Sequence, residues 1–208
     1  MHIVFIEPRF PGNQKLFVKA LAEVGATISA VGEGAKDSLD DDLKRWLHHY
    51  ESVTNVCDEQ AVLGAVRFVH RCAPIDRLEA TVEAHILPTA HVREKVGIPG
   101  TSTRTAFLCR DKPAMKEVLR AGGVPCAESA GATSVDEVRA FAARVGYPII
   151  IKPRDGAGAA GATRVSYDGE IEPALRALGV DRPGRSVAVE EFIEGHEGFY
   201  DTLTLDGE

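Results

Sequence analysis

The stretch that decides the fold is Gly146–Val165, GYPIIIKPRDGAGAAGATRV. Its three isoleucines are typical of a buried strand, and they lead through Lys152 into a loop of glycine and alanine. After the loop, residues 163–167 are again rich in β-forming residues, and a helical pattern returns only at residues 171–178. The sequence therefore predicts a strand, a glycine-rich loop and a second strand.

The loop itself, Gly156–Gly161, fits two nucleotide-binding motifs by spacing alone. A G-x-G-x-x-G turn would indicate a nicotinamide-dependent (NAD(P)) oxidoreductase, but in that motif a helix opens inside the glycines. A phosphate-binding P-loop requires a lysine where this sequence has Ala162. The predicted second strand disfavours the first motif and the missing lysine disfavours the second.

A third interpretation is a glycine-rich hairpin that lies flat on nucleotide phosphates and offers them backbone N–H groups. Lys152, at the end of the preceding strand, would supply the cation, as a strand lysine does in kinases. The plainer alternative is a surface hairpin that ends in a solvated lysine.

Upstream of this hairpin, the sequence predicts two helices with capping residues. Asp111 is a candidate N-cap for a helix that starts with Lys112 and buries Met115, Val118 and Leu119. Ser134 and Glu137 form a capping-box pattern for the next helix.

The first hundred residues alternate between strand and helix patterns, which predicts an open parallel sheet with helices on both faces. The expected elements are a strand at 2–7, helix 16–24, strand 26–31, helix 43–50, a helix from 58, strand 78–82 and a short helix around 92–96. Polar and glycine-rich residues at 97–105 indicate a domain boundary. Arg9 follows the first strand, where open α/β sheets bind ligands, and is a candidate contact for a substrate carboxylate.

The composition excludes several classes. The 208 residues carry 24 Lys and Arg against 31 Asp and Glu, a net charge of −7, so a duplex-DNA binder is not expected. No apolar run is long enough to span a bilayer. The four cysteines form no Cys-x-x-Cys pair, which favours free thiols in a reducing cytoplasm and no zinc site.

Three segments in order carry a resemblance: DKPAMKEVLRAGGVPC (111–126), GYPIIIKPRDGAGAAGATRV (146–165) and VEEFIEGHE (189–197). Together they resemble the ATP-grasp ligases, in particular the biotin carboxylase, carbamoyl-phosphate synthase and carboxylate–amine ligase branches. The resemblance implies three parts: a Rossmann-like pre-ATP-grasp α/β domain (1–100), the α+β small subdomain with the glycine loop (101–185), and the start of the large subdomain (186–208).

The resemblance also assigns roles to individual residues. Lys112 and Lys152 match the two family lysines on the nucleotide phosphates, and Gly156, Gly158 and Gly161 match the loop that closes over them. Glu190 matches the acid that accepts from the adenine amino group. The backbone of Glu191 and Ile193 matches the segment that pairs with the adenine edge, and Glu197 matches the acid on the ribose hydroxyls.

The resemblance implies an ATP-dependent ligase of small-molecule carboxylate and amine substrates that acts through an acyl phosphate. The magnesium-binding carboxylates and the catalytic arginine of the family are expected beyond Glu208. Residues 199–205 look like a strand and Asp206-Gly207 like a hairpin turn without its returning strand, so we expect an N-terminal fragment that is inactive alone. A homodimer, a non-catalytic nucleotide-binding module and the NAD(P) oxidoreductase remain open at this stage.

Overall fold

The computed structural model describes residues 1–154, 161–180, 184–196, 198, 200 and 202. The chain divides into two compact units, Met1–Arg110 and Asp111–Glu208. This division falls ten residues after the boundary that we placed at residue 100, because residues 103–110 form a helix that packs within the first unit. Among the described residues, no helix combines the length and apolar character of a membrane-spanning segment.

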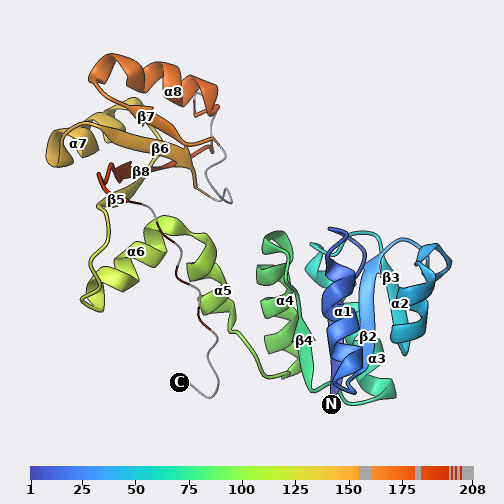
Figure 1. The fold of residues 1–208 in the computed structure, drawn as a ribbon. Coiled ribbons are helices and arrows are strands. Elements are labelled where there is room, and N and C mark those ends of the chain that lie inside the picture. The colour runs from blue at the N-terminus through green and yellow to red at the C-terminus, as the bar shows by residue number, and fades with distance from the viewer. Residues whose placement is uncertain (155–160, 181–183, 197, 199, 201, 203–208) are drawn as a thin grey trace. The chain divides into compact units, whose positions relative to one another are not determined.

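The first unit is built on a parallel four-stranded sheet in the order β3-β2-β1-β4 (Figure 1). Its strands are β1 (His2–Ile6), β2 (Thr27–Glu33), β3 (His49–Val53) and β4 (Arg77–Glu79). This confirms the open parallel α/β sheet that the sequence predicted.

Helices cover both faces of this sheet. The helical elements of the unit are α1 (Gln14–Glu23), the 3₁₀ turn η1 (Lys36–Ser38), α2 (Asp41–Trp46), α3 (Glu59–Cys72), α4 (Glu83–Val96) and α5 (Thr103–Arg110), the last of which packs on α4. Successive residues of β1 point to opposite faces. Phe5 packs with Val18 of α1 and Leu43 of α2, whereas Val4 and Ile6 pack with α3 and α4.

The second unit has a four-stranded antiparallel sheet in the order β5-β8-β6-β7. The strands are β5 (Ser129–Ala132), β6 (Ile149–Pro153), β7 (Thr163–Val165) and β8 (Val187–Glu191). The helical elements are α6 (Lys112–Ala121), α7 (Val135–Val145), the 3₁₀ turn η2 (Asp168–Glu170) and α8 (Ile171–Ala177). Figure 1 shows α7 and α8 on one face of the sheet, where they enclose the core that includes Ile149, Ile151 and Val189.

The structure corrects the helix that we predicted over residues 43–50. Helix α2 ends at Trp46, Leu47 is extended, and Tyr50 lies in β3. Tyr50 nevertheless joins the same buried cluster as Leu43, because both pack on one face of the sheet. Its position at helical spacing was a coincidence between a helix and the strand after it.

Three other expectations differ in detail or lie outside what is described. Val118 of α6 is 43% exposed, whereas Met115 and Leu119 are half-buried. Helix α4 is longer than the short helix we predicted. Most of the strand predicted at 199–205, and the Asp206-Gly207 turn, lie outside the described residues.

Candidate functional site

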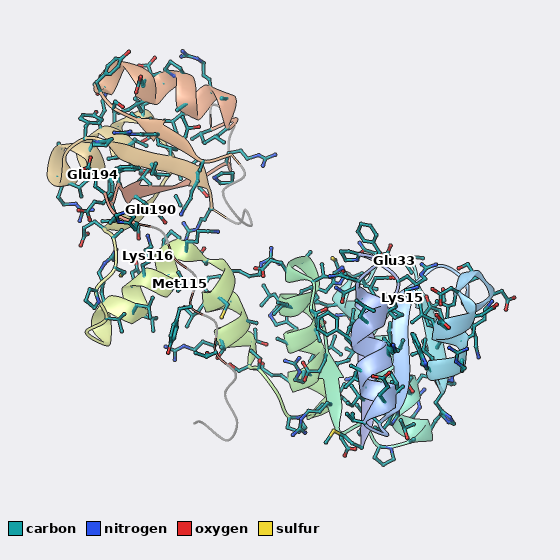
Figure 2. The ribbon with its side chains drawn as sticks, in the orientation of Figure 1. Lys15, Glu33, Met115, Lys116, Glu190 and Glu194 are labelled. Atoms are coloured by element: carbon teal, nitrogen blue, oxygen red, sulfur yellow. The ribbon has the colours of Figure 1, made fainter. Side chains whose placement is uncertain are left out.

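A carboxylate between two ammonium groups is the centre of the candidate site in the second unit. Lys152 Nζ lies 2.6 Å from Glu190 Oε2, and Lys116 Nζ lies 3.0 Å from Glu190 Oε1. All three side chains are largely enclosed, with exposures of 19%, 13% and 11% for Lys152, Lys116 and Glu190. Figure 2 shows Lys116 and Glu190 reaching toward each other from α6 and β8.

The strand register explains why Lys152 and Glu190 meet. Ile150 of β6 lies directly opposite Glu190 of β8, and Lys152 is two residues further along β6. Side chains two apart on a strand share a face, and diagonal neighbours on an antiparallel pair are within reach of long side chains. The alternate residues Ile149, Ile151 and Val189 enter the apolar core on the other face. The sheet therefore separates an apolar face from a charged one.

The electrostatics keep Glu190 ionised. Burial raises the pKa of the Glu190 carboxyl, but the hydrogen bonds and charges of Lys152 and Lys116 outweigh burial, and the pKa lies below its ordinary value. Two ammonium groups around one carboxylate leave one net positive charge in a partly dry site. Each ammonium has three N–H donors, so each can hold Glu190 and still donate to a second anionic group.

A second ion pair fixes the start of α6 to the end of β6. Asp111 caps α6 by accepting from the Ala114 N–H at 2.9 Å, and it also accepts from Arg154 Nε at 2.7 Å and Nη2 at 3.3 Å. Burial raises the Asp111 pKa, but the hydrogen bonds from Arg154 and Ala114 and the charges of Arg154 and Lys112 lower it overall. This contact joins the two elements that carry Lys112, Lys116 and Lys152.

Replacing Asp111 by alanine is expected to lower the stability of the second unit by about 2 kcal/mol, because a helix cap and a charged hydrogen-bond partner are lost together. The loss should shrink in acid, since a carboxyl with a lowered pKa stabilises only while ionised. Hydrogen exchange of the α6 and β6 amides under denaturant measures the effect. Asp136→Ala is the matched control, since that first-turn acid is 95% exposed. Equal losses in both variants would contradict the capping role.

The glycine loop connects two antiparallel strands. Ile151 of β6 pairs with Thr163 of β7, so a strand follows the loop, as the sequence predicted, and no helix opens at Gly161. This context does not fit the dinucleotide turn of an NAD(P) oxidoreductase. Gly161 has φ +76°, and a Cβ there would lie 3.1 Å from Pro153 Cγ, so a side chain would be strained and crowded. Gly156 and Gly158 lie outside the described residues.

The remaining predicted contacts lie on α6 and at the end of β8. Lys112 is the first residue of α6 and is half-buried. The Glu191 N–H donates to the Glu128 carbonyl at 2.9 Å, and the Glu191 side chain accepts from the Glu128 N–H at 3.1 Å. Ile193 follows β8 and is 61% exposed. Glu197 lies outside the described residues. The nucleotide roles of these residues stay predictions.

Sequence reasoning missed Lys116. The signal was available, because Lys116 is four residues after Lys112 and therefore on the same face of α6. Lys116 is the α6 residue that the structure places against Glu190.

The sequence is similar to several known proteins. Residues 111–198 match the family model of the carbamoyl-phosphate synthase L chain, ATP-binding domain. The chain is 29% identical over 167 residues to the L-arginine-specific L-amino acid ligase of Bacillus subtilis. The aligned region covers 78% of this chain and 40% of that protein. It is 33% identical over 103 residues to the carbamoyl phosphate synthase large chain of Mycobacterium sp. (strain JLS), over 49% of this chain and 9% of that one.

Solved structures show the same fold. The L-amino acid ligase of Bacillus licheniformis superposes with a TM-score of 0.70 at 19% identity, over 93% of this chain and 44% of that one. The biotin carboxylase domain of the Hydrogenobacter thermophilus 2-oxoglutarate carboxylase was solved with MgADP. It superposes with a TM-score of 0.69 at 22% identity, over 92% of this chain and 44% of that one. The chain thus spans less than half the length of these proteins. Residues 111–198 are therefore similar to the ATP-binding domain of the carbamoyl-phosphate synthase L chain, and more than nine-tenths of the chain has the fold of these ATP-grasp ligases.

Proposed function

We propose that this chain forms the ATP-binding part of an ATP-dependent carboxylate–amine ligase that acts through an acyl phosphate. The observation that carries the proposal is the enclosed Lys116–Glu190–Lys152 cluster, within the region that matches an ATP-binding domain. Its net positive charge and its ammonium N–H groups suit a polyphosphate.

In this proposal, Lys152 and Lys116 turn their remaining N–H groups to the phosphates, with Lys112 at the start of the same helix. Gly156, Gly158 and Gly161 belong to the loop that covers the phosphates and excludes water. Glu190 accepts from the adenine amino group. The Glu191 carbonyl and the Ile193 N–H pair with the ring edge, and Glu197 binds the ribose hydroxyls. These groups position and neutralise the nucleotide rather than react with it.

The chemistry of such a ligase has two steps. A substrate carboxylate attacks the γ-phosphorus and releases ADP, and an amine then displaces phosphate from the acyl phosphate to form an amide. Magnesium, when bound, would neutralise negative charge on the phosphates during phosphoryl transfer. Among the described residues, no group of three His, Cys, Asp or Glu side chains could hold a metal ion. A cytoplasmic location and a homodimer belong to the same proposal.

Binding is the direct test of the nucleotide site. We expect ATP, and not NAD⁺, to bind saturably in calorimetry and to slow amide exchange in α6, β6 and β8, because ordering around a bound ligand opposes local opening. Protection of these elements by NAD⁺ alone would overturn the proposal.

Ligase activity needs a separate assay. On the protein as its gene encodes it, ADP formation should require a carboxylate and an amine together, and hydroxylamine should trap the acyl phosphate as a hydroxamate. ATP binding without either product would support a non-catalytic nucleotide-binding module instead.

A further inference from the structure

The first unit has a polar pocket at the carboxyl edge of its sheet. Open α/β sheets bind ligands outside the carboxyl ends of their strands, where the loops after the strands meet. The loop after β1 and the segment after β2 meet at a pocket of about 260 Å³, lined by Arg9, Gly12, Lys15, Ser38, Asp40 and Leu43. Figure 2 shows Lys15 at the same edge as Glu33, the last residue of β2.

Arg9 is held in place by groups behind it. Its Nη1 donates to Ser38 Oγ at 2.9 Å, and its Nε lies 3.5 Å from Glu7 Oε1. Its guanidinium lies against the backbone of Gly34, where a Cβ would approach Nη2 to 3.0 Å. Within the described part of the chain, Arg9 Nε is buried and has no hydrogen-bond partner. Arg9 is therefore fixed between Ser38 and Glu7 where it lines the pocket, and 28% of its side chain remains exposed.

The two carboxylates near the pocket are already engaged. Glu7 is 4% exposed and accepts from the N–H groups of Glu33 at 2.7 Å and Arg9 at 3.3 Å. Asp40 accepts from the Leu43 N–H at 2.8 Å, and this bond is the main reason that its pKa is lowered. Both acids therefore have backbone donors that satisfy them in addition to the cations.

The two cations have donors to spare. A guanidinium has five N–H groups and an ammonium has three. Among the described contacts, the Arg9 side chain donates one hydrogen bond, to Ser38, and Lys15 makes only a long contact of 3.5 Å to Asp40. The unsatisfied capacity is therefore on the donor side, and a matching ligand must bring acceptor oxygens.

We infer that this pocket binds a carboxylate or phosphate group of a small molecule through Arg9 and Lys15. The inference rests on the proposed function only in one respect, that the ligand is a substrate of the ligase. The bound group then anchors the substrate in the first unit.

The test follows the Arg9 Nε–H and the Gly12, Lys15 and Ser38 amides by NMR while inorganic phosphate or acetate is added at constant ionic strength. We expect saturable shifts at these resonances with one or both anions, and not with chloride. The anion that binds more tightly shows whether the pocket takes a phosphate or a carboxylate group. Arg9→Gln and Lys15→Gln should each weaken binding by about tenfold, the usual loss for one charge-assisted hydrogen bond.

Lys19→Gln is the matched control, because Lys19 is one turn further along α1, is 50% exposed and pairs with Glu23. Lys15 is 41% exposed, so its variant tests the pocket even if Arg9→Gln fails to fold. Absence of saturation with both anions, or equal loss in Lys19→Gln, would overturn the inference. Anion binding without ATP binding would overturn the nucleotide site alone, and the reverse would overturn the pocket alone.

Discussion

Replacing Lys152 by methionine is expected to weaken ATP binding by about 30-fold or more, while the second unit stays folded. A charge-assisted hydrogen bond in a partly dry site contributes roughly 2–3 kcal/mol, and every 1.4 kcal/mol is about a tenfold change in affinity. Lys116 remains 3.0 Å from Glu190 in this variant, so the carboxylate keeps a partner and the fold is spared. Methionine preserves the apolar stem of lysine and removes the ammonium group with its charge and N–H donors. Calorimetry with ATP measures the loss.

Arg144→Gln is the matched control for Lys152→Met. It removes one positive charge from the same unit at a side chain that is 60% exposed. The affinity for ATP should therefore change by less than a factor of about two. Equal losses of ATP affinity in the two variants would mean that ATP binding depends only on the net charge of the unit. Unchanged affinity in Lys152→Met would reduce Lys152 to a partner of Glu190 and would remove the main support for the nucleotide site.

The sequence predicted the Lys152 strand correctly for a physical reason. Three consecutive isoleucines favour a strand, and β6 buries Ile149 and Ile151 on one face while Ile150 lies half-buried on the other. The β-branched residues after the loop favour a second strand, which β7 forms by pairing with β6. The ligand roles of Lys152 and Glu190 came from a resemblance. That the two side chains touch depends on the register of β6 against β8, which joins residues 38 positions apart.

The sequence could not separate elements whose boundaries depend on tertiary packing. Leu43, Trp46, Leu47 and Tyr50 follow helical spacing, yet the chain becomes extended at Leu47, because Tyr50 completes the core from β3. Similarly, the polar residues before Phe107 looked like a linker, but Ser102 Oγ lies 3.0 Å from Thr105 Oγ1 and accepts from its N–H as α5 begins. In both places the local sequence pattern fits more than one structure. The packing of Tyr50 in the core and of α5 on α4 determines where each helix ends or begins.

Replacing Glu190 by glutamine is expected to destabilise the second unit more than any other single change in the site. The Glu190 side chain is 11% exposed, and its ionised carboxylate is the group that Lys152 and Lys116 share. Without this charge two ammonium groups remain close together in an enclosed site. Removing one member of a buried ion pair typically costs about 3–5 kcal/mol. Hydrogen exchange of the β6 and β8 amides under increasing denaturant reports this loss within the second unit itself.

The pH dependence separates the charge of Glu190 from its shape. The folded-state pKa of Glu190 is lowered, so its contribution is complete above the unfolded-state pKa of about 4.3 and is lost as the pH falls through the folded-state value. The stability difference between the native chain and Glu190→Gln should therefore be largest near neutral pH and should shrink in acid. A difference that stayed constant would show that packing, and not charge, is responsible.

A triple variant with Glu190→Leu, Lys116→Met and Lys152→Met should regain most of the lost stability, since apolar groups of similar volume can replace a buried ionic cluster, but it should not bind ATP. Stability without nucleotide binding in the triple variant would show that these three charges serve the ligand rather than the fold, whereas retained ATP binding would refute the site.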